Sequence, residues 1–290
     1  MAIVVITGTS TGIGLATAVA LGRAGHDVFA TMRRPDRSPD LQSIAARESL
    51  PITILPLDVD QDDSVAQAIN QILAARGRID VLVNNAGISS IEVVEKLPLS
   101  DYRQMMETNF FGALRCIQAV LPGMRARQSG CIINVSSVGG RVAIPGMSAY
   151  CASKFAMEAM SEALAAEVKA HNIRVSIIEP GVIETPIFNK HGNPSTDSPY
   201  PQPRRQNALF TVFLKNPASP LVVGELIREI IESNSGQLRY PAGPDAAGFL
   251  AWRAGISDED LVRLFGTSDD EAWCNYIHST FGVDVRPHLL

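Results

Sequence analysis

The beginning of the chain combines an apolar run, a glycine-rich turn and a helical segment, and no other feature limits the fold as strongly. Residues 2–7 read A-I-V-V-I-T, a continuous run typical of a parallel strand buried on both faces. The turn that follows carries Gly8, Gly12 and Gly14 in the spacing G-x-x-x-G-x-G, and a helical segment then extends to Gly25. This succession predicts the first strand, turn and helix of a β-α-β unit.

Strand-like and helical segments alternate through most of the chain. Helical patterns are predicted at residues 62–76, 101–127, 148–171 and 221–233. Further strand-like runs lie at residues 27–32, 52–58, 81–84, 131–135, 174–178 and 237–242. The alternation predicts an α/β fold with a single Rossmann-type, doubly wound parallel sheet of about seven strands and helices on both faces.

The segment after Pro180 lacks this regular pattern. Residues 188–205 are rich in proline, asparagine, serine and charge, so we predict a mobile substrate loop, with 188–215 as its full extent. Residues 245–290 form a C-terminal extension, in which Ser257 is the predicted N-cap of a helix with acidic residues in its first turn. Because no repeat or linker divides the chain, residues 1–290 are predicted to form one domain.

Composition argues against several other classes of protein. The net charge is −5 and the basic residues are scattered, so we expect no nucleic-acid partner. No apolar run is long enough for a membrane span, and the N-terminus lacks the features of a secretory signal. The four cysteines show no C-x-x-C spacing and the five histidines no metal-ligand spacing. We therefore expect a cytoplasmic protein with reduced thiols and no metal site.

The glycine-rich turn is interpreted as a phosphate cradle. Glycine lets the backbone approach a phosphate closely, and the N-terminus of the following helix offers unpaired N–H groups and a positive dipole. A flexible turn without a ligand is the alternative. The position of the turn between the first strand and the first helix favours dinucleotide binding.

The residues at the end of the second strand distinguish NADP from NAD. An acidic residue at this point would bind the ribose 2′-hydroxyl of NAD, but the chain has Met32 there, followed by Arg33 and Arg34. A guanidinium can bind a 2′-phosphate through two hydrogen bonds. We predict NADP, with NAD as the alternative cofactor and solvated surface charges as the alternative role of the arginines.

Tyr150 and Lys154 are the candidates for proton transfer. They lie four residues apart on a predicted helix and therefore on one face of it. A free phenol has a pKa of about 10, and a nearby cation lowers this pKa, which lets the phenol exchange a proton with a carbonyl or alcohol oxygen. The same spacing also occurs in ordinary surface pairs. Here, however, a strand ending in Ser136 and Ser137 precedes the helix.

Together these motifs resemble the short-chain dehydrogenase/reductase family over residues 2–186. Two runs, F-A-T-M-R and Y-C-A-S-K-F-A-M-E, are similar to its hydroxysteroid and retinol dehydrogenase branch. The family motifs are T-G-x-x-x-G-x-G at 7–14, N-N-A-G at 84–87, Asn109 in N-F-F-G, Ser137 thirteen residues before Tyr150, Y-x-x-x-K at 150–154 and P-G-x-x-x-T at 180–185.

The resemblance implies a role for each matched residue. Tyr150 would be the acid/base, Lys154 would lower its pKa and hold the nicotinamide ribose, and Ser137 would polarise the substrate oxygen. Asn109 would hold a water that links Lys154 to solvent, and Ser136 would help to end the strand. Asp58 and Val59 would border the adenine, and Ile183 and Thr185 would fix the carboxamide. The implied cofactor contacts are Gly8, Ser10, Gly12, Ile13, Gly14, Arg33, Asp58, Val59, Asn85, Ala86, Gly87, Tyr150, Lys154, Pro180, Gly181, Ile183 and Thr185.

The implied activity is the reversible reduction of a carbonyl to an alcohol with NADPH, by hydride transfer from the cofactor. An apolar substrate is expected, because the predicted pocket would be lined by Val138, Val142, Ile144, Met147, Ile187 and Phe188. A non-catalytic dinucleotide-binding regulator or scaffold is the first alternative, but it would not need Ser137, Tyr150 and Lys154 together. A sugar-nucleotide epimerase or dehydratase is the second, and the glycine spacing argues against it.

The resemblance also implies a homo-oligomer, either a dimer or a tetramer. Members of the family commonly pair through the helices that correspond here to residues 101–127 and 148–171. Met157, Met160 and Leu164 would form an apolar seam in such a pair, unless these side chains face the sheet instead.

Overall fold

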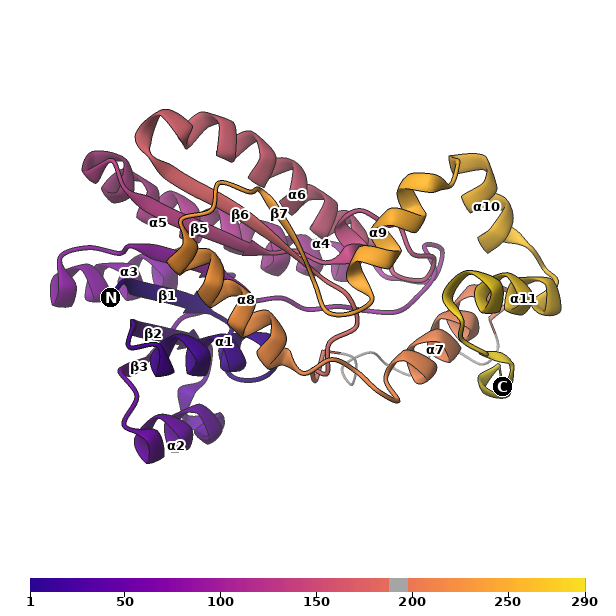
Figure 1. The fold of residues 1–290 in the computed structure, drawn as a ribbon, viewed down its shortest axis with the longest axis horizontal. Helices are drawn as coiled ribbons and strands as arrows, with labels where there is room; N and C mark the ends of the chain where they lie inside the picture. The colour runs from indigo at the N-terminus through magenta and orange to yellow at the C-terminus, as the bar shows by residue number, and fades with distance from the viewer. Residues whose placement is uncertain (188–197, 290) are drawn as a thin grey trace.

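The protein is described from a computed structural model, which describes residues 1–187 and 198–289 (Figure 1). Its centre is a sheet of seven parallel strands in the order β3-β2-β1-β4-β5-β6-β7. The strands are β1 (Ile3–Thr7), β2 (Asp27–Met32), β3 (Ile52–Pro56), β4 (Val81–Asn84), β5 (Gly130–Val135), β6 (Ile173–Pro180) and β7 (Arg239–Ala242). The predicted Rossmann-type α/β fold is confirmed.

The strand order reverses next to β1, and this reversal positions the site. The chain runs from β1 outward to β3, then crosses back so that β4 pairs with the other side of β1. The loops after β1 and β4 therefore leave the sheet in opposite directions and open a crevice at its carboxyl edge. Ligands of doubly wound sheets bind in such a crevice.

Helices cover both faces of the sheet because alternate strand residues point to opposite sides. Ile3 and Val5 pack with α3 (Asp62–Arg76), α5 (Gly112–Arg127) and α6 (Ser148–Val168) in one apolar core. Val4 and Ile6 pack on the other face, in a core shared with α1 (Gly12–Arg23), α2 (Pro39–Glu48) and α8 (Pro220–Ser233). Both faces of the central strands are thus buried, which explains their unbroken apolar sequence.

The helix predicted at residues 101–127 is interrupted. It consists of α4 (Leu99–Met106), a π-helical turn at Glu107–Phe111 and α5. The side chain of Asn109, within the π turn, hydrogen-bonds the backbone of Ile88 instead of facing solvent. π turns inside helices are frequent at functional sites.

Part of the segment predicted as a loop at 188–215 is helical. Residues 188–197 lie outside the described residues, but Gln202–Phe213 form α7. Pro203 is tolerated because it lies in the first helical turn, where its missing N–H leaves no intrahelical bond unmade. The buried guanidinium of Arg205 pairs with Asp270, and Ala208 is fully buried. These long-range contacts stabilise α7. Its own sequence has no regular apolar spacing from which the helix could be predicted.

The C-terminal extension contains three helices, α9 (Ala246–Gly255), α10 (Asp258–Gly266) and α11 (Asp270–Phe281). Figure 1 shows them gathered with α7 at one end of the molecule, away from the N-terminus. Ser257 accepts a hydrogen bond from the Asp260 N–H, which confirms it as the N-cap of α10. A separate apolar cluster, built around the fully buried Trp273, holds α7 and the extension together.

The proposed seam residues on α6 point inward. Leu164 and Met160 pack into the core between α6 and the sheet, and the Met157 side chain is 1% exposed. The structure thus favours the alternative that these residues stabilise the fold. Within residues 1–187 and 198–289, no helix is long and apolar enough to cross a membrane.

Candidate active site

A cavity of about 700 Å³ opens at the carboxyl edge of the sheet. Side chains from the ends of β1 to β6 form one half, and residues of α7 and the C-terminal extension form the other. Gly14 and Asn109 are the two predicted site residues that do not line the cavity. The others all do, namely Gly8, Ser10, Gly12, Ile13, Arg33, Asp58, Val59, Asn85, Ala86, Gly87, Ser137, Tyr150, Lys154, Pro180, Gly181, Ile183 and Thr185.

The glycine-rich turn after β1 leaves no room for a side chain at its three glycines. Gly8 and Gly12 have φ angles of +72° and +60°, which favour glycine. A Cβ on Gly8 would lie 2.7 Å from Ala86 Cα, and one on Gly14 would lie 2.3 Å from the Gly8 carbonyl oxygen. Gly14 therefore does not line the cavity, but its lack of a side chain allows α1 to pack against the turn.

Hydrogen bonds fix this turn to the loop after β4. Thr7 Oγ1 accepts from the backbone N–H groups of Asn85 and Ala86, at 3.0 and 3.1 Å. Asn85 Nδ2 donates to the carbonyl oxygens of Thr7 and Gly8, at 2.9 and 3.0 Å. The N-cap residue of α1, Thr11, makes no side-chain capping bond, so the first N–H groups of the helix are free to bind an anion at the cavity.

The end of β2 presents two cations to the cavity. Arg33 and Arg34 are exposed and line it, and neither forms an ion pair with any residue that the structure describes. Asp58 and Val59, after β3, line the same region. This end of the cavity is thus suited to an anion beside a flat, largely apolar group.

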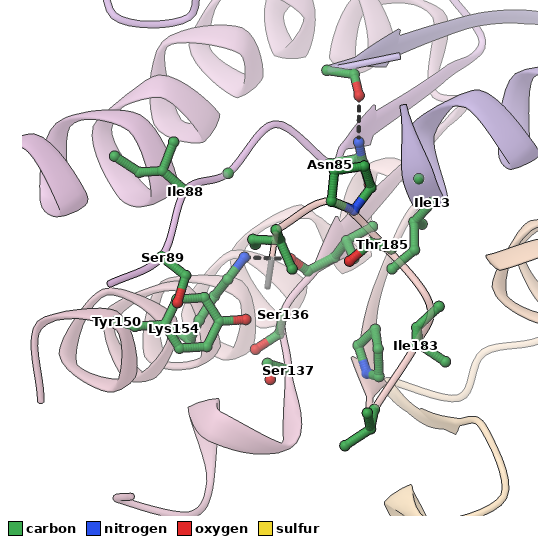
Figure 2. A pocket seen from close by; sticks show the side chains of 18 of the residues that line it. Ile13, Asn85, Ile88, Ser89, Ser136, Ser137, Tyr150, Lys154, Ile183 and Thr185 are labelled. Atoms are coloured by element: carbon green, nitrogen blue, oxygen red, sulfur yellow. Dashed lines mark hydrogen bonds between the residues drawn. The ribbon is translucent and has the colours of Figure 1, made fainter. Parts of the chain in front are cut away.

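Tyr150, Lys154 and Ser137 meet on the wall of the cavity beside β5 (Figure 2). Tyr150 and Lys154 lie one turn apart on α6, and Ser137 follows β5. The Ser137 and Tyr150 side chains lie next to each other in Figure 2, and Ser137 Oγ accepts from the Gly139 N–H at 3.0 Å. Lys154 Nζ lies 5.8 Å from the Tyr150 ring centroid and donates to the Val135 carbonyl oxygen at 2.8 Å.

The pKa values of this pair differ from the sequence-based prediction. Burial raises the pKa of Tyr150 to about 12, although the hydrogen bond with Ser137 opposes this. Burial lowers the pKa of Lys154 to about 8, against the attraction of Glu158. Burial disfavours the charged form of both groups, and the ammonium faces the phenol ring and the Val135 carbonyl. In the protein alone, therefore, the lysine does not make Tyr150 acidic.

Asn109 does not line the cavity, but its hydrogen bonds hold two parts of the site together. Its side chain is fully buried; Oδ1 accepts from the Ile88 N–H at 2.8 Å, and Nδ2 donates to the Ile88 carbonyl oxygen and Ser153 Oγ, both at 2.9 Å. Ser153 Oγ in turn donates to the Tyr150 carbonyl oxygen at 2.7 Å. Asn109 thereby joins the loop after β4 to the helix that carries Tyr150 and Lys154.

Comparisons with known proteins agree with this geometry. The family model described as short chain dehydrogenase matches residues 2–195. The chain belongs to the short-chain dehydrogenase family. The resemblance inferred from its motifs is confirmed.

Similar members of the family include reductases and dehydrogenases. This short-chain dehydrogenase is 36% identical over 247 residues to 3-ketodihydrosphingosine reductase of Bacteroides thetaiotaomicron, with 83% of this chain and 88% of that protein covered. It is 44% identical over 192 residues to retinol dehydrogenase 8 of Bos taurus, with 64% and 61% covered. The structure of a short-chain dehydrogenase from Streptomyces avermitilis matches with a TM-score of 0.80 at 33% identity, covering 91% of this chain and 96% of that one.

The lowered pKa of Lys154 predicts a pH-dependent stability in this short-chain dehydrogenase. The ordinary pKa is 10.5 and the folded value about 8, so between these values the unfolded chain binds more protons. The free energy of unfolding then rises with pH, by at most about 1.4 kcal/mol per pH unit. Relative to Lys154→Met, the wild-type protein should gain stability across this window and not below it. Urea unfolding measures the difference, and parallel curves for the two proteins would contradict the lowered pKa.

The sequence analysis missed the second half of the cavity, which belongs to α7 and the extension. The predicted residues Val138, Val142, Ile144, Met147 and Ile187 do line the cavity, whereas Phe188 lies outside the described residues. Five of the ten phenylalanines and both tryptophans fall between residues 210 and 281, and this density was the available signal. The unpredicted lining residues include Gln206, Leu209, Phe210, Phe213, Phe249, Trp252, Phe265, Ile277 and Phe281.

Proposed function

We propose that the protein is an NADP(H)-dependent oxidoreductase that interconverts an apolar ketone or aldehyde with its alcohol. The placement of Ser137, Tyr150 and Lys154 together on the cavity wall carries this proposal. A carbonyl oxygen placed between the two hydroxyls would have two hydrogen-bond partners and a proton donor. The names of two relatives, a 3-ketodihydrosphingosine reductase and a retinol dehydrogenase, support a carbonyl or alcohol substrate.

The residues present fit a nicotinamide dinucleotide. The turn after β1 has no space for side chains at its glycines, and the N-terminus of α1, without a side-chain cap, would bind the pyrophosphate, with Ser10 and Ile13 beside it. Asp58 and Val59 would border the adenine, and Ile183 and Thr185 would hold the carboxamide. The further contacts would come from Asn85, Ala86, Gly87, Pro180 and Gly181. When bound, the cofactor would supply or accept the hydride.

The protein's own part in the reaction is the movement of a proton. With a pKa near 12, Tyr150 keeps its proton at neutral pH and would donate it to the carbonyl oxygen during reduction. Ser137 would polarise that oxygen, and Lys154 would hold the nicotinamide ribose. In the oxidation direction, the positive charge of an oxidised nicotinamide would favour the Tyr150 phenolate. Asn109 would hold the water that connects Lys154 to solvent.

The preference for NADP predicts a strong effect of Arg33. Arg33→Glu should raise the Kd for NADPH by roughly ten- to a hundredfold, because a charged hydrogen bond to the 2′-phosphate is replaced by repulsion. The Kd for NADH should change little. Arg37→Glu is the matched control, since Arg37 is exposed on the same loop and does not line the cavity. Equal losses for both cofactors, or none, would contradict the assignment of Arg33 to the 2′-phosphate.

The proposed activity is tested by NADPH consumption with a panel of apolar ketones and aldehydes, after parallel titrations with NADPH and NADH. Reduction of at least one long-chain or cyclic ketone is the expected result. Tight binding of NADPH without reduction of any member of the panel would instead support the alternative of a dinucleotide-binding regulator.

We further propose a cytoplasmic protein that forms a homo-oligomer. All four cysteines are buried and unpaired, as is usual in a reducing compartment. Phe111, beside α5, and Phe155, on α6, are 43% and 42% exposed, and they lie in the segments through which pairing is expected. Light scattering in solution would measure the oligomeric state, and a monomer at high concentration would contradict it.

A further inference from the structure

Gln206 places a polar amide in the apolar half of the cavity. It lies on α7, is 5% exposed and lines the cavity. Its side chain makes no hydrogen bond to any residue within 1–187 and 198–289. Gln202, one turn earlier on α7, differs in that its Nε2 donates to the Phe265 carbonyl oxygen at 2.9 Å, while its Oε1 is buried without a partner among the described residues.

The amide of Gln206 is therefore available to a molecule in the cavity. A glutamine amide offers two N–H donors and a carbonyl acceptor. The amide atoms are not enclosed by protein, because Gln206 borders both the large cavity and a small void beside Trp273. A leucine in this position would fill the space without a polar group to desolvate.

The surroundings of Gln206 are aromatic. Phe249 packs against Phe213 and Phe281 with ring centroids 5.5 and 5.0 Å apart, and Trp252 packs against Phe281 at 5.3 Å. Trp252 donates its indole N–H to the Tyr276 hydroxyl at 3.1 Å, so this polar atom is already bonded. The rings form an apolar wall of the cavity from α7 to α11. Gln206 adds a polar amide to this wall.

Gln206 and Tyr150 line the same cavity from different helices. Phe210 packs in the same apolar cluster as Tyr150 and Met147, and Gln206 precedes Phe210 by one turn of α7. The neighbours of Gln206 in the small void, among them Phe265 and Trp273, do not belong to that cluster. A molecule in the cavity that reaches both Tyr150 and Gln206 would contact them through two separate groups.

We propose that Gln206 is a specificity-determining residue that hydrogen-bonds a second polar group of the substrate, distinct from the reacting oxygen. The substrate class is an apolar ketone or alcohol that carries a second, neutral hydroxyl, keto or amide group. The group is neutral because Gln206 carries no charge and the nearby guanidinium of Arg205 is paired with Asp270. This assignment rests on the proposed function, since Ser137 and Tyr150 define the reacting end.

The test compares two long-chain methyl ketones of equal length, one with a terminal hydroxyl and one without. For the wild-type enzyme, kcat/KM should favour the hydroxy ketone. In Gln206→Leu, the ratio of the two kcat/KM values should fall by roughly tenfold, the effect of one lost hydrogen bond. Gln206→Met serves as a second variant of closer shape. Asn207→Leu, which makes the same kind of change on the exposed side of α7, should leave the ratio unchanged.

A binding measurement separates this proposal from the proposed function. Trp252 lines the cavity, so quenching of its fluorescence reports ketone binding without turnover, including in a Tyr150→Phe background. Gln206→Leu should weaken binding of the hydroxy ketone roughly tenfold relative to the alkyl ketone. This result without any reduction by the wild-type protein would retain the assignment of Gln206 and refute the oxidoreductase. Equal effects on both ketones, or no effect on either, would overturn the assignment.

Discussion

Replacing Tyr150 with phenylalanine is expected to lower kcat by about 10²–10⁴-fold while the Kd for NADPH changes little. The substitution removes the hydroxyl beside Ser137, and with it the proton that a carbonyl oxygen would receive. The ring stays in the apolar cluster of Ile91, Met147 and Cys151, so the shape of the pocket is retained. Single-turnover reduction of a verified ketone and a titration with NADPH measure the two quantities.

Tyr240→Phe provides the control for the loss of a tyrosine hydroxyl. Tyr240 lies on β7, its hydroxyl donates to Ser235 Oγ at 2.6 Å, and it does not line the cavity. This variant should turn over at the wild-type rate. If Tyr150→Phe did the same, another group would have to supply the proton and the proposed mechanism would be wrong.

Gly14→Ala is expected to abolish dinucleotide binding and to lower the free energy of unfolding by roughly 1–3 kcal/mol. The added methyl would lie 2.3 Å from the Gly8 carbonyl oxygen and 2.4 Å from Asn85 Nδ2, two atoms that are hydrogen-bonded to each other. No rotamer can relieve the contact, because it involves Cβ itself. The turn must therefore open, and the cradle would lose its shape.

Gly248→Ala is the matched control for this second prediction. Gly248 lies in α9, and a Cβ added there would have no neighbouring atom within 4 Å, so the same methyl should instead stabilise the helix by about 0.5–1 kcal/mol. Urea unfolding and NADPH titration of both variants give the comparison. Retained NADPH affinity in Gly14→Ala would show that the dinucleotide does not depend on this turn.

The sheet could be predicted from the sequence because its signals are local. The bounds of β2, β4 and α3 agree with the prediction, since each is a run whose apolar spacing fits one period and whose ends carry clear breaks. The half of the site near β5 could also be predicted, because Ser137, Tyr150 and Lys154 lie within one strand-loop-helix segment. The structure places these three side chains together on the cavity wall.

The remaining features depend on contacts between distant residues. Helix α7 is fixed by the pairing of Arg205 with Asp270, far along the chain, so its own sequence does not reveal it. The pKa values of Tyr150 and Lys154 depend on burial, which their spacing does not report. The aromatic half of the cavity forms only when helices α7, α9, α10 and α11 pack together. The sequence alone therefore could not identify Gln206 as a residue of the cavity.

The residue at which the family match ends indicates where related proteins can differ. The match to the short-chain dehydrogenases ends at residue 195, whereas the aromatic wall begins on α7 and continues to Phe281. A related protein that differed only after residue 195 would keep the glycine-rich turn, Ser137, Tyr150 and Lys154, yet line this half of the cavity with other side chains. Shared motifs alone would therefore not reveal which molecules such a protein admits.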